Sequence, residues 1–324
     1  MRTTLRRKRT SRVDIPGPVR QSRAMHADPL TSPDTLSAAL RETAYLPDEG
    51  LATVTWLAHA LRRPLLLEGE PGTGKTALAE ALAELQGVPL IRLQCYEGIE
   101  ASQALYDWDF PRQILHLRAV EALAGSAEGG DADAVTRLEA DLFDERFLQA
   151  RPVLRALREA PCVLLIDEID RADDEFEAFL LEVLSTWSVS IPELGVVSAT
   201  TPPFVVLTSN RTRELHDALK RRCLYHWIEH PGLARELEIV RARLPQVEPE
   251  LARQVVEVVQ QLRAEDELVK PPGVAETLDW VRALAALGQS RLDPEVAAAT
   301  MGAAVKYRED TERVRVALDR MLTR

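Results

Sequence analysis

The chain has 324 residues, of which 46% are hydrophobic and 5% aromatic, so it is long enough for two domains with aliphatic cores. No apolar stretch approaches the roughly 20 residues of a membrane span, and the first 24 residues contain no apolar segment of a secretory signal. The three cysteines lie far apart and form no metal-ligand or redox pair. We therefore expect a cytoplasmic protein with reduced thiols and no membrane span.

The charge is unevenly spread along the chain. Residues 1–24 carry eight Arg or Lys and one Asp, although the whole chain has a net charge of −11. Such a tail can bind nucleic acid or anionic lipid, but a solvated arm, or a true start at Met25, explains it more simply. The acidic remainder lacks the basic stripe that duplex DNA requires. We predict a disordered basic tail over residues 1–33 and no nucleic acid partner.

Short apolar runs separated by helical patterns predict an α/β fold with a parallel sheet covered on both faces. Two helices come first, one from Asp34, a plausible N-cap, to Arg41 and one from Leu51 to Leu61. The predicted strands are Pro64–Glu68, Pro89–Leu93, Cys162–Ile166, Phe204–Thr208 and Leu224–Ile228. From residue 231 onward every apolar pattern is helical, so we predict a core domain over 34–230 and an all-α domain over 231–324.

A complete phosphate-binding pattern follows the first predicted strand. Its residues are Gly69, Glu70, Pro71, Gly72, Thr73, Gly74, Lys75 and Thr76, and Ala77 follows in the next helix. The glycines let the backbone fold tightly, so that N–H groups converge on phosphate at a helix start that favours anions. Lys75 can reach the β- and γ-phosphate oxygens, and the Thr76 hydroxyl can bind Mg²⁺. The strand–loop–helix setting therefore predicts a nucleotide bound with Mg²⁺.

Hydrolysis needs further groups beside this loop, and the ends of two other strands supply them. Asp167 can hold Mg²⁺, while Glu168 can orient and polarise the attacking water. Asn210, after a third strand, can donate to the γ-phosphate, although turns also favour Asn. Arg221 and Arg222 precede the last strand, where a guanidinium can stabilise a phosphoryl transition state or simply end an exposed helix. The combination predicts an ATPase that uses ATP and Mg²⁺.

The motifs GEPGTGKT, LLIDE, TSN and LKRRC, in this order, resemble those of AAA+ ATPases over roughly residues 34–324. The resemblance implies an AAA+ P-loop core with a parallel five-stranded sheet in the order 5-1-4-3-2, a C-terminal all-α lid and a homo-hexameric ring. It implies that Arg222, or as second choice Arg221, is an arginine finger for the neighbouring subunit's site. Tyr45 and Leu46 stand where related proteins line the base pocket, although Tyr45 is equally suited to a core.

Two segments narrow the resemblance to one group. Residues 188–199 resemble a hairpin of the MoxR group, and residues 94–118 resemble its insertion after the second strand. The segments at 94–98, 106–108, 270–272 and 275–280 most resemble the branch found with carbon monoxide dehydrogenase accessory genes. This implies a chaperone-like ATPase that acts on a protein client with a von Willebrand factor A partner, often in metalloenzyme maturation. A metal-chelatase-like motor subunit and a DNA-acting AAA+ ATPase stay open as alternatives.

One stretch departs from the family pattern. Many AAA+ lids carry an Arg at the start of a lid helix, but residues 272–276 contain none. Arg282 lies two turns further along, and we do not expect it to take that place. The sequence thus leaves open which group couples the lid to the γ-phosphate.

Overall fold

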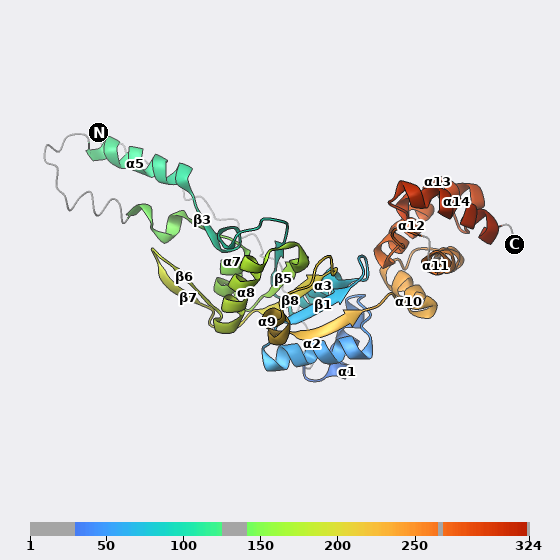
Figure 1. Cartoon of the computed structure of the whole chain (residues 1–324), viewed down its shortest axis with the longest axis horizontal. Helices are drawn as coiled ribbons and strands as arrows, with labels where there is room; N and C mark the ends of the chain where they lie inside the picture. The colour runs from blue at the N-terminus through green and yellow to red at the C-terminus, as the bar shows by residue number, and fades with distance from the viewer. Residues whose placement is uncertain (1–29, 125–140, 265–267, 323–324) are drawn as a thin grey trace, which may run out of the picture.

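The computed structural model describes residues 30–124, 141–264 and 268–322, and Figure 1 shows their arrangement. A five-stranded parallel sheet lies at the centre, in the order β2-β5-β8-β1-β9. The strands are β1 (Leu65–Gly69), β2 (Leu90–Gln94), β5 (Val163–Asp167), β8 (Phe204–Ser209) and β9 (Leu224–Ile228). Counted along the chain, this is the predicted order 5-1-4-3-2, and each strand begins within one residue of its predicted start.

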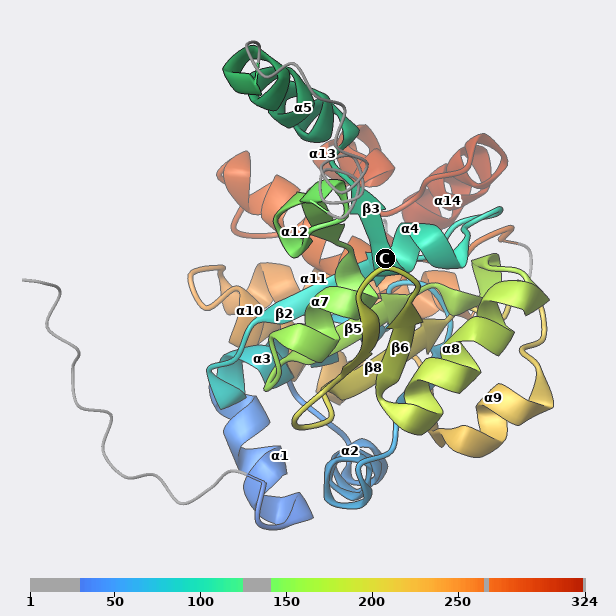
Figure 2. The ribbon, with the colours of Figure 1, turned by 90° about the vertical axis from the view of Figure 1, so that its left-hand side faces the viewer.

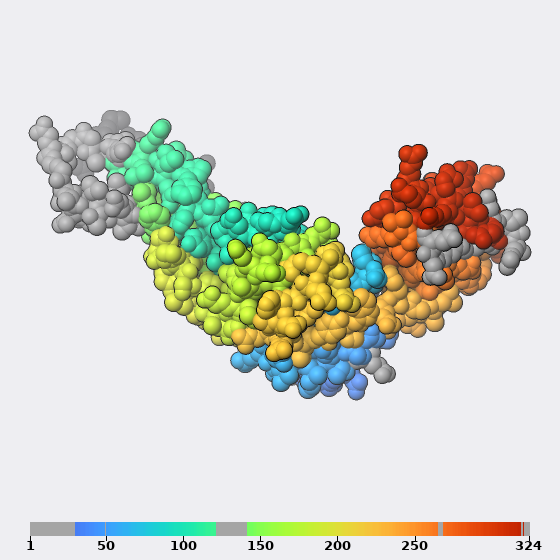
Figure 3. All heavy atoms as spheres, viewed as in Figure 1, coloured from blue at the N-terminus to red at the C-terminus, as the bar shows by residue number. Residues whose placement is uncertain are grey.

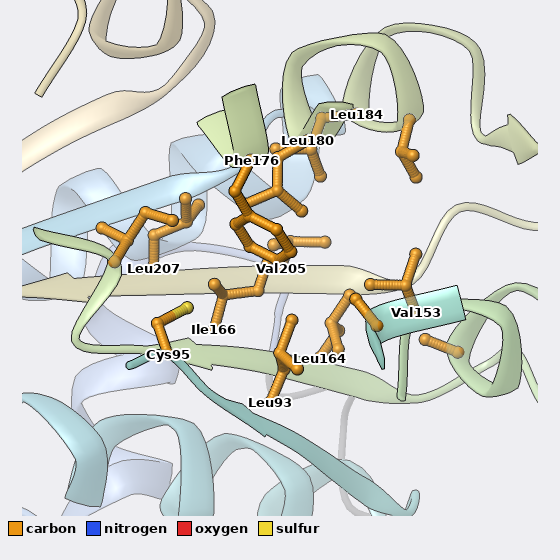
Figure 4. Packing of buried hydrophobic residues seen from close by; sticks show 14 of the residues in the cluster. Leu93, Cys95, Val153, Leu164, Ile166, Phe176, Leu180, Leu184, Val205 and Leu207 are labelled. Atoms are coloured by element: carbon orange, nitrogen blue, oxygen red, sulfur yellow. The ribbon is translucent and has the colours of Figure 1, made fainter. Parts of the chain in front are cut away.

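Helices cover both faces of the sheet, because alternate strand residues point to opposite sides. These helices are α1 (Pro33–Glu42), α2 (Glu49–Leu61), α3 (Lys75–Gln86), α7 (Pro152–Arg158), α8 (Asp174–Thr186) and α9 (Asp217–Arg222). Leu65 and Leu67 join one core with α1, α2 and α3. Ile166 and Leu207 join the other core with α7 and α8, where Figure 4 shows Phe176 packed over the strands.

The start of α1 corrects the predicted N-cap. The cap is Ser32 and not Asp34, since the Ser32 hydroxyl accepts from the Thr35 N–H at 3.2 Å. Thr35 Oγ1 in turn accepts from the Ser32 N–H at 2.9 Å, which completes a reciprocal capping box. Pro33 fills the first helical position, where its missing N–H costs nothing. Asp34 lies in the first turn, so its charge still suits the helix dipole.

Two segments project from the sheet at one end of the molecule (Figures 1 and 2). The insertion after β2 contains α4 (Ala101–Leu105), β3 (Tyr106–Trp108) and α5 (Phe110–Ala124). A short 3-10 turn, η1 (Glu145–Phe147), leads into β4 (Leu148–Ala150), which pairs antiparallel with β3. The predicted hairpin is confirmed as β6 (Ser188–Ile191) and β7 (Gly195–Ser198).

The C-terminal helices form a lobe at the other end, set apart by a notch in Figure 3. They are α10 (Leu233–Arg243), α11 (Pro249–Arg263), α12 (Val274–Ala286), α13 (Pro294–Thr300) and α14 (Arg308–Leu322), with a 3-10 turn, η3 (Met301–Ala303). We call residues 231–264 and 268–322 the helical lobe. It has its own core, in which Val255, Val259 and Trp280 are fully buried. None of the helices in the described parts of the chain has the length and apolar character of a membrane crossing.

A buried ion pair ties three helices of this lobe together. Glu236 of α10 is fully buried, and both of its carboxylate oxygens accept from the Arg263 guanidinium, at 2.6 and 2.8 Å. Gln260 and Thr277 also donate to Glu236, at 2.7 and 2.6 Å. These four hydrogen bonds compensate the desolvation of the charge, so the loss of one partner would leave a buried carboxylate uncompensated.

We predict that Arg263→Met destabilises the helical lobe by about 3–5 kcal/mol, because Glu236 loses its counterion while it stays buried. Arg253→Met on the same helix is the matched control, since Arg253 pairs with Glu250 and Glu257 in solvent. Urea unfolding followed by circular dichroism measures both. Equal midpoints for the two variants would contradict the importance assigned to the buried pair.

Candidate active site

A cavity of ≈ 490 Å³ lies between the sheet and the helical lobe, and this volume suits a nucleotide. The sheet side contributes the phosphate-binding loop at 71–76 together with Asp167, Glu168 and Asn210. Tyr45 and Leu46, from the segment between α1 and α2, line it as well. The carboxyl ends of the parallel strands open into this cavity, which is where open α/β sheets hold their ligands.

The conformation of the loop explains its glycines. Gly72 and Gly74 have φ angles of 77° and 96°, in the region that side chains disfavour. At Gly69 the neighbouring chain sets the limit, because an added Cβ would lie 2.3 Å from the Ile228 carbonyl oxygen of β9. Thr73 Oγ1 donates to the Glu70 carbonyl at 2.9 Å, which closes the turn. Gly74 ends the loop as the N-cap of α3.

Lys75 lies inside the curve of the loop. Its ammonium group donates to the carbonyl oxygens of Gly69 and Glu70, both at 2.8 Å, and its side chain is buried. Burial lowers the Lys75 pKa from 10.5 to about 8, against the opposing influence of nearby carboxylates, chiefly Asp170. The Lys75 ammonium is thus positioned beside the main chain that forms the phosphate site.

Asp167 connects the loop to the strands. Its Oδ1 accepts from Thr76 Oγ1 at 3.0 Å and from Thr208 Oγ1 at 2.5 Å, while its Oδ2 accepts from Arg92 at 2.5 Å. The carboxylate is buried, so these donors replace the water it would otherwise bind. Thr76 and Asp167, the two predicted Mg²⁺ ligands, therefore meet at one point of the cavity. Oxygen donors of this kind are the ones that Mg²⁺ prefers.

Glu168 faces the cavity from an unusual backbone position. Its φ angle is 56°, and its N–H donates to Thr208 Oγ1 at 2.9 Å. Its carboxylate is held by Gln94 at 3.2 Å, by Asn210 at 3.4 Å and by Arg171 at 3.2 Å. Left-handed non-glycine residues are costly and gather at functional sites. The predicted pair Glu168 and Asn210 thus lies in direct contact.

Tyr45 lies both in the hydrophobic core and at the cavity wall, the two positions that the sequence left open. The ring is buried in the core with α1 and α2, yet it lines the cavity, and its Cε2 lies 4.0 Å from where a Cβ on Gly74 would sit. Burial raises its pKa well above the usual range, so the hydroxyl stays protonated. Leu46 lines the same wall and offers its carbonyl to Arg235 of the helical lobe at 2.7 Å.

The helical lobe supplies residues that sequence reasoning missed. Arg235 and Arg243 of α10 line the cavity, as do Leu278 and Arg282 of α12. Arg282 thus faces the cavity, while the expectation that it does not take the place of the lid arginine stays a prediction. Helix α12 runs along the cavity wall, so residues at helical spacing from its first turn, among them Leu278 and Arg282, share the face that lines it. The four-residue spacing between Leu278 and Arg282 is the sequence signal that could have placed Arg282 at the cavity. Its distance from the start of the helix gave no such indication.

Arg221 and Arg222 lie away from the cavity. They end α9, and the Arg222 guanidinium donates to Ser185 Oγ of α8. Arg63 holds this helix end, because its guanidinium donates to the carbonyls of Arg221, Arg222 and Cys223 at 2.6, 3.0 and 3.2 Å. Neither finger candidate therefore contributes to the cavity of its own chain.

Comparison with known proteins identifies the family. Residues 65–228, which include every strand of the sheet, match the model of the "ATPase family associated with various cellular activities (AAA)". The chain belongs to the AAA family. The family is one of ATPases, so ATP hydrolysis is the activity that residues 65–228 carry, and the loop at 69–76 is the place in the fold where such ATPases bind phosphate.

Individual relatives of this AAA ATPase match only in part. The FtsH 4 zinc metalloprotease of Synechocystis sp. is 28% identical over 195 residues, which are 57% of this chain and 25% of that protein. Protein CbbQ of Allochromatium vinosum is 38% identical over 61 residues, 19% of this chain and 82% of that sequence. Thermotoga maritima RuvB, a Holliday junction branch migration motor, aligns over 83% of this chain and 70% of its own, with 18% identity and a TM-score of 0.41. The chain thus spans 25% of the length of FtsH 4. It also matches the midasin of Giardia intestinalis, of which it spans 1%.

The Lys75 pKa of about 8 predicts how nucleotide binding by this AAA ATPase depends on pH. Above pH 8 the free protein holds Lys75 largely neutral, whereas phosphate binding favours the charged form. Mg-ADP binding should then take up a proton, and affinity should fall roughly tenfold per pH unit above 8. Calorimetry in buffers of different ionisation enthalpy measures the proton uptake. Lys75→Arg is the control, because Arg stays charged and should give a flatter profile; a flat wild-type profile from pH 7 to 9.5 would refute the prediction.

Proposed function

We propose that this chain is a MoxR-type AAA+ ATPase, of the branch associated with carbon monoxide dehydrogenase accessory proteins, that remodels a protein client. Support comes from the β6–β7 hairpin and from the insertion after β2, the two segments on which the resemblance to this group rests. The match to CbbQ over 61 residues is in keeping with an accessory role. In this proposal residues 34–230 are the nucleotide-binding core and 231–324 the lid. The predicted disordered tail over residues 1–33 lies outside the described residues as far as residue 29, and its last residues are ordered, because Ser32 caps α1 and Pro33 begins it.

The hydrolytic part of the proposal rests on one observation, the contact of Thr76 with Asp167 beside Glu168 and Asn210. Thr76 and Asp167 would hold Mg²⁺, which supplies a positive charge that offsets the charge on the phosphates. The 3.0 Å separation of their oxygens fits that role, with Arg92 on the far oxygen of Asp167. Lys75 and the loop amides would bind the phosphate chain.

Glu168 is the proposed general base. It lies at the carboxyl end of β5 on the cavity wall, where its carboxylate can accept a proton from a water directed at the γ-phosphate. Asn210 donates to the same carboxylate, so its amide can align both the base and the water. Gln94 and Arg171 contact the other carboxylate oxygen of Glu168 and so restrict the orientation of its side chain.

We predict that Glu168→Gln binds Mg-ATP with near wild-type affinity but hydrolyses it about 10²–10⁴-fold more slowly, because the amide cannot accept the proton. Phosphate release and fluorescent-nucleotide binding measure the two properties. Glu182→Gln, an exposed position on α8, is the matched control and should keep full turnover. Normal turnover in Glu168→Gln would refute the assignment of this residue as the base.

The ring is the second part of the proposal. Neither Arg221 nor Arg222 lines the cavity of its own chain, which fits a finger that serves a neighbour in a homo-hexamer. Arg222, next to β9, is the first candidate, and Arg63 holds the helix end from which it projects. A guanidinium presented in this way can stabilise the charge on the transferred phosphoryl group.

We predict that Arg222→Ala protein and Lys75→Ala protein are each inactive but regain ATPase activity when mixed. In a mixed ring, some Arg222→Ala subunits, whose phosphate-binding loop is intact, lie beside Lys75→Ala subunits, whose arginine is intact. An arginine finger raises the rate of such sites about 10³–10⁵-fold. Turnover of the mixture, with mixed assembly verified by mass spectrometry, is the measurement. Arg221→Ala serves as the comparison, and rescue with that variant alone would move the finger to Arg221. Verified mixed rings without any rescue would exclude a finger in trans.

The partner and client form the third part of the proposal. We infer a cytoplasmic complex with a von Willebrand factor A domain protein, acting in the maturation of a metalloenzyme. The Glu168→Gln protein held with ATP is the suitable bait, because it should retain client and partner together. Recovery of a von Willebrand factor A protein supports this proposal. Metal-dependent tetrapyrrole product would favour a chelatase motor instead, and DNA-stimulated turnover would favour a DNA-acting ATPase.

A further inference from the structure

The first turn of α12 rests directly on the phosphate-binding loop. The Ala275 N–H donates to the Gly72 carbonyl at 3.2 Å. A Cβ on Gly273 would lie 2.7 Å from the Pro71 carbonyl oxygen and 3.0 Å from the Gly72 Cα. A Cβ on Gly72 would in turn lie 3.2 Å from the Gly273 Cα. The two main chains thus touch at a point where both residues lack a side chain.

Gly273 is held firmly from the side of the helical lobe. Its N–H donates to Glu276 at 3.0 Å, and its carbonyl accepts from the Thr277 N–H at 3.1 Å. The preceding carbonyl, that of Pro272, accepts from Arg263 at 2.6 Å, and Arg263 pairs with buried Glu236. The residues that contact the loop are therefore held by hydrogen bonds to α11 and α12, which are tied to α10 through Glu236.

The same ion-pair cluster reaches the connection between sheet and lobe. Gln260 donates to Glu236 at 2.7 Å and to the Pro231 carbonyl at 2.8 Å. Pro231 follows β9 and precedes α10, so it stands where the chain crosses from the sheet to the lobe. A continuous set of hydrogen bonds thus runs from this crossing point to Gly273 and on to the loop at Gly72.

The contact also orients one amide of the loop. In a planar trans peptide the C=O and the following N–H point in opposite directions. The Gly72 carbonyl points toward Ala275 of α12, so the Thr73 N–H points away from that helix. Thr73 lines the cavity, and its N–H is one of the main-chain donors that such a loop offers to phosphate. Gly72 has no Cβ, so without the hydrogen bond from Ala275 its backbone allows the 72–73 peptide more than one orientation.

We propose that the contact of Gly273 and Ala275 with Gly72 is a latch that couples the helical lobe to the phosphate-binding loop. It is a main-chain contact at the start of α12, where the sequence has no arginine. With the latch closed, the 72–73 peptide is fixed for phosphate binding, and displacement of the lobe releases it. The inference rests on the proposed binding of nucleotide phosphate at this loop. Gly273 acts here as a positioning residue, since it reaches the nucleotide only through the loop.

Gly273→Ala tests the latch. The φ angle of −83° at Gly273 suits alanine, so the penalty comes from the collision of its Cβ with the Pro71 carbonyl oxygen, the Glu276 carboxylate and the Gly72 Cα, at 2.7, 2.9 and 3.0 Å. We expect the dissociation constants of Mg-ADP and Mg-ATP to rise about fivefold or more, the effect of losing roughly one hydrogen bond. The KM for ATP should rise with them, while kcat at saturation changes less than twofold, because Asp167 and Glu168 are untouched. Gly302→Ala is the matched control, in the same lobe with open space around it.

A structural measurement separates the latch from a general loss of fold. Amide hydrogen exchange at Ala275 should be faster in Gly273→Ala than in the wild type and in Gly302→Ala, with melting temperatures within about 3 °C of each other. Wild-type nucleotide affinity together with wild-type exchange at Ala275 would overturn the latch and leave the ATPase assignment intact. Faster exchange with unchanged affinity would likewise overturn the coupling. Absence of nucleotide binding by the wild-type chain would instead refute the proposed function.

Discussion

The buried Asp167 carboxylate is the interaction on which the site depends. It lies at the end of β5, between β2 and β8, and accepts hydrogen bonds from α3, β8 and β2 through Thr76, Thr208 and Arg92. A buried charge without such donors would be strongly destabilising, so the four elements must keep this spacing. Thr208 also accepts from the Glu168 N–H. One carboxylate therefore fixes the distance between the phosphate loop and the strand ends that carry Glu168 and Asn210.

Much of the fold could be predicted from the sequence, because its determinants are local. Apolar runs bounded by Pro and Gly gave the strands within one residue, and the resemblance to AAA+ ATPases implied the sheet order. The residues chosen at the strand ends, Asp167, Glu168 and Asn210, do converge on the phosphate loop in the structure. A parallel sheet places the ends of its strands along one edge, so a polar residue at such an end is informative without any knowledge of packing.

The rest depends on contacts between distant segments, which no local pattern encodes. Arg282 lines the cavity only because α12 runs along its wall, and Arg63 supports the end of α9 across a separation of more than 150 residues. Gly273 looks like an ordinary residue before a helix, and its closeness to Gly72 appears only when the lobe is docked. The cap at Ser32 was missed for a simpler reason: Asp34 is an equally good capping residue, and Pro33 between them decides the matter by occupying the first helical position.

The two walls of the cavity carry charges of opposite sign. The helical lobe contributes three cations to its walls, Arg235, Arg243 and Arg282, and no acid. The sheet side contributes five acids, Asp48, Glu80, Asp167, Glu168 and Glu229, against two cations, Lys75 and Arg92. The two walls therefore attract each other across the gap, even though the chain as a whole is strongly acidic. A phosphate chain between them would bring its own negative charge to the three arginines, and dissolved salt would screen the attraction between the walls.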